Sequence, residues 1–188
     1  MNRRDFLKKA GLGSVAFGSL PVLGETLATP ALADGDHKTF HFAALGGGGT
    51  IGGVVHTLVL AGDGKFSDAQ VEGGGVFNHV NLNPSLPIPK PVLASGTWKA
   101  KRLISFQSIG SSGETLAGLL KMDIDVVRLI PSPGVFPAHL QIVCNIPFAG
   151  LFTGHPEGFT LTGLPVTFSP LNPTIGITIF GAAVEERD

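Results

Sequence analysis

The sequence predicts an all-β protein, either an antiparallel β-sandwich or a small β-barrel of about eight strands. Three observations lead to this prediction. Segments rich in β-branched and aromatic residues are separated by turns rich in glycine and proline, of which the chain has 27 and 14. Several of these segments alternate polar and apolar residues, as strands with one buried face do. Helical periodicity is almost absent after residue 33.

The predicted strands are short and regularly spaced. We expect a single domain over residues 34–188, because a chain of this length can bury one core. Residues 116–129 begin with good helix formers, but their β-branched, alternating second half favours a strand. Strands are predicted at residues 38–45, 54–61, 69–80, 92–109, 118–130, 138–146, 158–161, 164–168 and 174–180.

The clearest alternation lies in residues 121–126. The odd-numbered residues from Lys121 to Asp125 are polar, and the even-numbered residues from Met122 to Val126 are apolar. Successive side chains of a strand point to opposite faces, so the even-numbered residues are expected in the core. Arg128 is the next even-numbered residue, and its charge interrupts the apolar stripe. It indicates a bulge in the strand, or an arginine that reaches the rim or enters a pocket.

The connections between strands have their own composition. Residues 83–91 contain four prolines, which favour an extended connection and disfavour a helix. Residues 131–134 and 171–173 are typical of turns. Asp63 and Gly64 form the dipeptide that is typical of a two-residue hairpin turn, so a turn is expected there.

Residues 46–53 are rich in glycine and contain a match to a dinucleotide-binding motif. Gly47, Gly49 and Gly52 satisfy the G-x-G-x-x-G spacing after an apolar segment. In a dinucleotide-binding fold a helix must follow, but residues 54–60 have the composition of a strand. We therefore interpret the glycines as a hairpin or a sharply bent strand.

Charge and cysteine content restrict the partners and the chemistry. The formal net charge is −1, and no basic stretch in residues 34–188 indicates a nucleic-acid partner. Cys144 is the only cysteine, so an intramolecular disulfide is excluded, and a buried, inert thiol is the preferred interpretation. A blue-copper centre is also excluded, because His155 follows Cys144 at too wide a spacing and no methionine comes after it.

Five residues are the candidate ligand-binding residues: Arg128, His79, His139, His155 and Glu157. His155 and Glu157 are two residues apart, so both can face the same ion, with His79 or His139 as a third ligand. Because zinc motifs are specific only when ligand spacings are paired, we prefer solvent-exposed histidines, and we predict no metal and no cofactor. No catalytic residue is assigned, since a G-x-S-x-G nucleophile motif is missing from the sequence.

Three functions remain, and the first is preferred. The chain has 13 phenylalanines, one tryptophan and no tyrosine, which suits an apolar core or an apolar ligand better than a sugar platform. The first hypothesis is therefore a domain that binds an apolar small molecule or another protein. The second is a β-barrel enzyme of the lyase or isomerase type, with Arg128 as its main clue. The third is a metal-binding protein that uses His155 and Glu157.

The N-terminal residues have the order of a signal peptide. A basic start is followed by an apolar stretch over residues 10–24, and Ala31 and Ala33 form an A-x-A cleavage site before Asp34. The stretch is broken by Pro21 and by glycines, so it is too short for a membrane anchor. We therefore expect residues 1–33 to be removed and residues 34–188 to be soluble.

The first residues also resemble a twin-arginine (Tat) export signal. The resemblance lies in Arg3 and Arg4, followed by Phe6, Leu7 and a lysine. It covers only this N-terminal segment, and Asn2 stands where serine or threonine is more usual. The resemblance implies that the twin-arginine export machinery is a partner, that the chain is exported already folded, and that it works in the periplasm or outside the cell.

Overall fold

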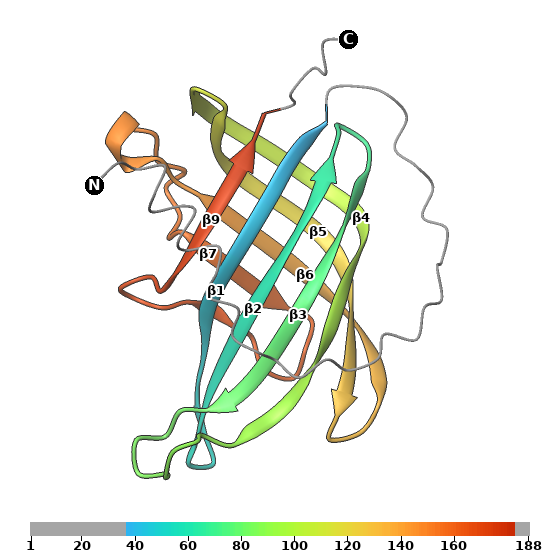
Figure 1. Ribbon diagram of the computed structural model, residues 1–188, viewed down its shortest axis with the longest axis vertical. Helices are drawn as coiled ribbons and strands as arrows, with labels where there is room; N and C mark the ends of the chain where they lie inside the picture. Colours follow the sequence, from blue (N-terminus) through green and yellow to red (C-terminus); the bar gives the residue numbers. More distant parts are fainter. Residues whose placement is uncertain (1–36, 183–188) are drawn as a thin grey trace, which may run out of the picture. The chain divides into compact units, whose positions relative to one another are not determined.

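Backbone hydrogen bonds join the strands into one antiparallel sheet. The computed structural model describes residues 37–182, so the predicted signal segment and its cleavage site lie outside the described residues. Nine strands form the sheet, which confirms the all-β prediction (Figure 1). The strands are β1 (Lys38–Ile51), β2 (Val54–Phe66), β3 (Val71–Asn81), β4 (Val92–Ser112), β5 (Thr115–Ile130), β6 (Gly134–Cys144), β7 (Gly158–Thr162), β8 (Ser169–Pro170) and β9 (Gly176–Gly181).

The sheet closes on itself through six of its strands. The strand order is β4-β3-β2-β1-β9-β5-β6-β7, and an additional pairing of β4 with β5 completes a ring. Strands β6 and β7 continue the sheet beyond β5, while β8 pairs with β1. Helical structure in residues 37–182 is limited to a 3-10 turn at Pro147–Ala149, and nothing there has the length and hydrophobicity of a transmembrane helix.

The glycine-rich segment at residues 46–53 belongs to a β-hairpin. Strand β1 runs through Gly47 to Ile51, and the chain turns at Gly52 and Gly53 before β2 begins. Both turn residues have positive φ angles, of 57° and 80°, which glycine adopts without strain. No crossover helix follows, as a dinucleotide-binding unit would require.

The predicted turn at Asp63 and Gly64 is wrong. Both residues lie within β2, and the chain turns later, where the Ser67 amide donates a hydrogen bond to the Gln70 carbonyl (2.9 Å). A Cβ atom at Gly64 would lie 2.1 Å from the Glu72 carbonyl oxygen, so the glycine lets β2 and β3 approach closely. The dipeptide has the composition of a turn, but the close contact with β3 is the reason that residue 64 is a glycine.

The alternation in residues 121–126 is confirmed in β5. Met122 and Ile124 are fully buried, while Lys121 is exposed and Asp123 is partly exposed. The strand begins at Thr115, so the segment with good helix formers is also extended. Its regular pairing with β6 carries this alternation through to Arg128.

Trp98 lies at the centre of the core and is 2% exposed. Its ring lies 6.5 Å from that of Phe40 and 5.9 Å from that of Phe42, and its Nε1–H donates to the Ala61 carbonyl at 3.0 Å. A Cβ atom at Gly62 would lie 2.2 Å from the indole ring. The glycine on β2 therefore makes the space that the tryptophan occupies.

The inward side chains change character along the ring. On β2 they run from Phe66 through Leu60 and Leu58 to His56, and the paired positions of β3 end in Phe77 and His79. Aromatic side chains thus fill one end, aliphatic side chains follow, and histidines stand at the other end. This second end is the lower end in Figure 1, where β4 begins and β5 ends.

We expect the Trp98→Phe variant to lose about 2 to 4 kcal/mol of unfolding free energy, because it leaves a void and removes the buried hydrogen bond of the indole. Denaturant unfolding at unchanged m value measures the loss. The matched control is Lys99→Ala, which removes an exposed neighbour on the same strand and should change stability by less than about 0.5 kcal/mol. Equal stability of the two variants would contradict the central role of the indole.

Candidate functional site

An apolar cavity of about 210 Å³ opens at the histidine-bearing end of the ring. Its walls come from strands β2 to β7 and from residues 164–168. Leu58, Leu60 and Phe77 form part of the apolar lining. His79 and Arg128 are the polar side chains among the lining residues. A concave apolar site with a few polar groups is the usual form of a small-molecule site.

The segment at residues 164–168 forms one wall of the cavity. A strand was predicted there, but the structure shows only an isolated bridge, in which Phe168 and Leu161 exchange backbone hydrogen bonds of 3.0 and 2.9 Å. Leu164, Val166 and Phe168 point toward the cavity. Prolines flank and interrupt the segment, so it cannot form a regular ladder. Instead it spans the space between β7 and β1.

His79 forms a pair with His56. The two residues are diagonal neighbours on the inner face of β2 and β3, and His56 Nδ1 lies 2.9 Å from His79 Nε2. Burial, and to a smaller extent the neighbouring His56, lowers the pKa of His79 to about 4. His79 is therefore neutral near pH 7. In such a pair one ring donates the shared hydrogen bond and the other accepts it.

Arg128 is held at the opposite wall by its own turn. Its Nε donates to the Ser132 carbonyl at 2.7 Å, its Nη2 donates to Ser132 Oγ at 3.0 Å, and the guanidinium lies 4.8 Å from the ring centre of Phe136. A guanidinium has five N–H groups, so three remain available for a ligand. Two of the arrangements that the sequence allowed occur together. The pairing of β4 with β5 shifts register between Ser95 and Gly96, opposite Ile130 and Arg128, and the Arg128 side chain lines the cavity.

His79 and Arg128 stand on either side of β4. His79 is paired with Ala94, and Arg128 is paired with Gly96, so small residues lie between them. Two strand spacings separate β3 from β5 along the sheet, which amounts to about 10 Å. A ligand in the cavity can therefore contact both polar side chains at once.

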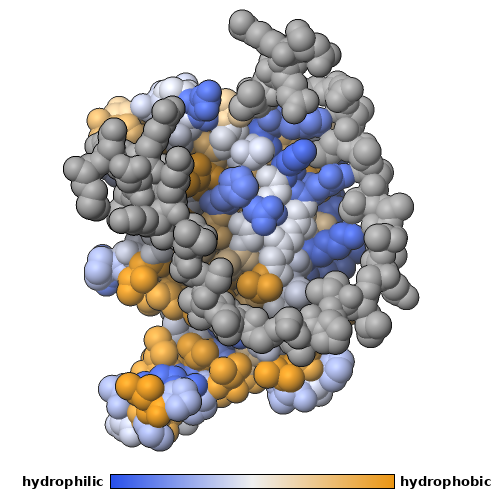
Figure 2. Space-filling model, viewed as in Figure 1, coloured by the Kyte–Doolittle hydropathy of each residue, from blue (hydrophilic) through white to orange (hydrophobic). Residues whose placement is uncertain are grey.

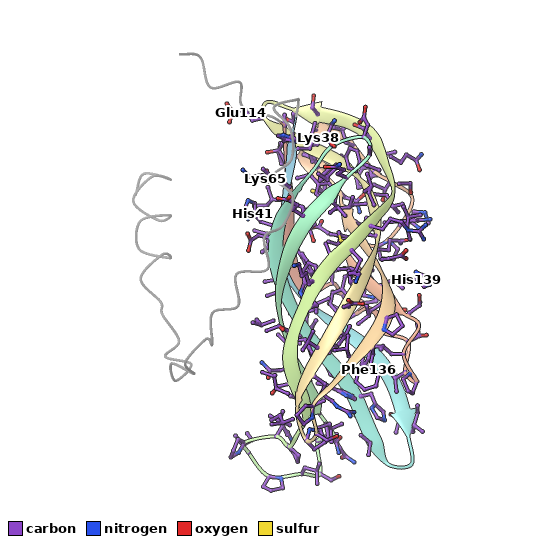
Figure 3. The ribbon with its side chains drawn as sticks, turned by 90° about the vertical axis from the view of Figure 1, so that its right-hand side faces the viewer. Lys38, His41, Lys65, Glu114, Phe136 and His139 are labelled. Atoms are coloured by element: carbon purple, nitrogen blue, oxygen red, sulfur yellow. The ribbon has the colours of Figure 1, made fainter. Side chains whose placement is uncertain are left out.

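His139 lies outside the cavity, on the outer surface of β6. Its Nδ1 is 2.6 Å from Asp123 Oδ1, and Arg102 Nε and Nη2 donate to Asp123 Oδ2 at 2.9 and 2.6 Å. The bonds from Arg102, followed by that from His139, hold the pKa of Asp123 below its usual value. Figure 3 labels His139 on the flank of the sheet, above Phe136. These three side chains form an exposed ionic cluster.

His155 and Glu157 lie in the connection between β6 and β7. The side chain of His155 is exposed, and its backbone amide and carbonyl are bonded to Thr153 and Asn145. Glu157 is partly buried, and this burial raises its pKa. Neither residue lines the cavity. Within residues 37–182, no three histidine, cysteine, aspartate or glutamate residues are placed to hold a metal ion.

Cys144 is buried, as the sequence indicated. Its Sγ lies 3.3 Å from the Thr178 carbonyl oxygen, to which the thiol donates. Burial raises its pKa above the ordinary value, so the thiol stays protonated near neutral pH.

Sequence reasoning missed His56 and the segment at residues 164–168 as parts of the site. A signal for His56 exists, because it shares its parity with the inward Leu58 and Leu60. Its pairing with His79 depends on the register between β2 and β3. Because the turn between these strands was predicted at the wrong place, the sequence did not give this register.

Comparisons with protein-family models, with curated proteins and with solved structures find no match to the chain.

We expect the free energy of unfolding to fall as the pH drops from about 6.5 to about 4, because the unfolded chain binds a proton at residue 79 more readily than the folded chain does. The contribution is on the order of 1 to 2 kcal/mol for this half-buried group. Denaturant unfolding at several pH values measures it. The His79→Gln variant should show a correspondingly weaker pH dependence, and an unchanged dependence would contradict the assignment.

Proposed function

We propose that the protein binds an apolar small molecule that carries a hydrogen-bond acceptor, such as a carbonyl or carboxylate group. The observation that carries this proposal is the apolar cavity, in which Arg128 offers unused donors beside hydrophobic walls. Apolar surface supplies affinity by leaving water, and the guanidinium supplies orientation. This is the first of the three functions that the sequence suggested.

The size of the cavity limits the ligand. An engineered protein cavity of about 150 Å³ is dry and binds benzene. The cavity here has about 210 Å³, so the apolar part of the ligand is somewhat larger than one benzene ring. A substituted ring or a short branched chain has this size, whereas a long fatty acid exceeds it.

Arg128 is arranged in advance for an acceptor. Its bonds to Ser132 and its contact with Phe136 hold the guanidinium at the wall before a ligand arrives. His79, whose pKa is lowered to about 4, adds no competing positive charge near pH 7. A charge-assisted hydrogen bond at the edge of an apolar site is stronger than one in water.

Exposed apolar side chains lie on the segments at the histidine-bearing end of the ring. Ile88 is 89% exposed in the connection between β3 and β4, Val92 is 51% exposed near Ala94, and Val135 is 61% exposed beside Phe136. Figure 2 shows orange residues gathered at this lower end. Such a surface is typical of a site that receives apolar ligands or partners. It supports entry of the ligand from this end.

Export by the twin-arginine pathway is part of the same proposal. It is supported by the residues of the signal segment, and it would place a folded binding domain in the periplasm or outside the cell.

We expect phenylacetate to bind the wild-type protein, and the Arg128→Gln variant to bind it at least about tenfold more weakly, because a charged hydrogen bond is lost. Toluene, which has no acceptor, should bind both proteins within about a factor of two. Titration followed by NMR measures both affinities.

The matched control for this prediction is Arg102→Gln, which removes an exposed arginine of the outer cluster and should leave both affinities unchanged. Ala94→Leu narrows the cavity and should weaken both probes. Equal binding of phenylacetate by the two arginine variants would contradict the role of Arg128.

We expect the Arg3→Lys and Arg4→Lys double variant to remain in the cytoplasm of a host that has the twin-arginine pathway, because paired arginines are the recognised feature. Mass spectrometry of the exported fraction should find a wild-type chain that begins at Asp34. Undiminished export of the double variant would refute this pathway.

A further inference from the structure

We infer that the cavity catalyses proton transfer on its ligand, with His79 as the base and Arg128 as the donor to the oxygen on which negative charge develops. The substrate class is an apolar carbonyl compound with a carbon–carbon double bond one position removed from conjugation, and the reaction is its isomerisation to the conjugated form. This inference rests on the proposed binding function and assigns an activity to the same site.

The pair of histidines has the geometry of a proton relay. His79 Nε2 is occupied by His56 Nδ1 at 2.9 Å, which leaves Nδ1 as the ring nitrogen of His79 that is available to a ligand. When Nε2 carries the hydrogen and donates it to His56, Nδ1 carries the lone pair. In this tautomer His79 can act as a base, and the hydrogen bond to His56 holds the orientation of its ring. His56 is a positioning residue in this arrangement.

The surroundings of His79 keep it in the basic form. Phe168 covers its ring edge-on at 5.2 Å, and Leu58 lies opposite it on β2. The charged or titratable side chains that face it are His56 from β2 and Arg128 across the cavity from β5. Burial and His56 depress the pKa of His79, so the ring is unprotonated before the substrate binds. An enolate that forms beside the ring raises its proton affinity at the moment of transfer.

The step balances without a further reactant. His79 Nδ1 takes a proton from the carbon between the carbonyl and the double bond, and the electron pair of that C–H bond enters a conjugated enolate. An N–H group of Arg128 donates to the enolate oxygen. The imidazolium then returns the same proton to the far carbon of the former double bond. Substrate and product have the same composition, and no oxidant, reductant or water is consumed.

The apolar walls contribute to this chemistry in two ways. They hold the reacting carbon and the carbonyl oxygen between His79 and Arg128, whose strands are about 10 Å apart. They also exclude water, which strengthens the interaction of Arg128 with the developing charge.

The test uses 3-cyclohexen-1-one, a ring of the size that the cavity admits. The wild-type protein should convert it to 2-cyclohexen-1-one, which is followed by ultraviolet absorbance and by proton NMR. We expect kcat/KM to fall at least about 100-fold in His79→Gln and in Arg128→Gln. His139→Gln alters a histidine of the outer surface and should leave the rate unchanged.

The role of His56 is tested by the pH profile. In the His56→Phe variant the neighbouring ring nitrogen is lost, so the pH at which kcat/KM falls on the acidic side should move upward from about 4. A variant that only loosened the fold would lower the rate without moving this midpoint.

Binding and catalysis are separated by cyclohexanone, the saturated analogue, in D₂O. One outcome is that cyclohexanone binds in a way that depends on Arg128, while the cyclohexenone is not isomerised and the α-hydrogens of cyclohexanone are not exchanged for deuterium. This outcome overturns the inference and leaves the proposed binding function standing. Absence of binding by both ketones and by phenylacetate overturns both. A His79→Gln variant as active as the wild-type protein overturns the assignment of the base.

Discussion

The hydrogen bond from the Trp98 indole to the Ala61 carbonyl organises this protein. An indole in the middle of a closed sheet needs both a polar partner and space, and the strands next to it supply both. Gly62 and Gly75 leave room where any Cβ atom would collide with the ring or with the facing backbone. Phe40 and Phe42 pack against the indole. The packing around Trp98 holds β2, β3 and β4 in one register. This register determines which of their residues face inward between Trp98 and the histidine-bearing end of the ring.

The cavity follows from this register. Past Trp98, the inward residues of β4 are Gly96 and Ala94, which are too small to fill the ring, and the space is lined instead by side chains from the neighbouring strands. The same register brings His79 next to His56 and sets Arg128 across from them. Residues 164–168 close the remaining side, because β7 and β1 are joined there only by a short bridge and by β8. Polar side chains thus stand at the open end of an apolar space, where a ligand can exchange solvent for protein contacts.

Much of the strand pattern was predictable from the residues, whereas the site was predictable only in part. The alternation from Lys121 to Val126 identified both the strand and its inward face, and the interruption at Arg128 marked a position where the register with β4 shifts and the side chain lines the cavity. In contrast, Asp63 and Gly64 have the composition of a turn but lie in a strand. A glycine is needed at residue 64 because β2 and β3 approach each other closely there. Among the five candidate residues, His79 and Arg128 meet at the cavity, while His139 joins an ionic cluster on the outer surface. Composition alone could not separate these histidines, since all of them lie on or near strands.

The sequence by itself determined the all-β class, the inward face of β5 and the exclusion of an intramolecular disulfide, because each depends on local periodicity or on a count of residues. The tertiary structure decided which strands close the ring, where the glycines serve packing instead of turns, and which two histidines share a hydrogen bond. These features depend on strand register across residues that are far apart in the chain. A shift of one residue turns every side chain to the opposite face, so register and not composition places a histidine in the cavity or in solvent.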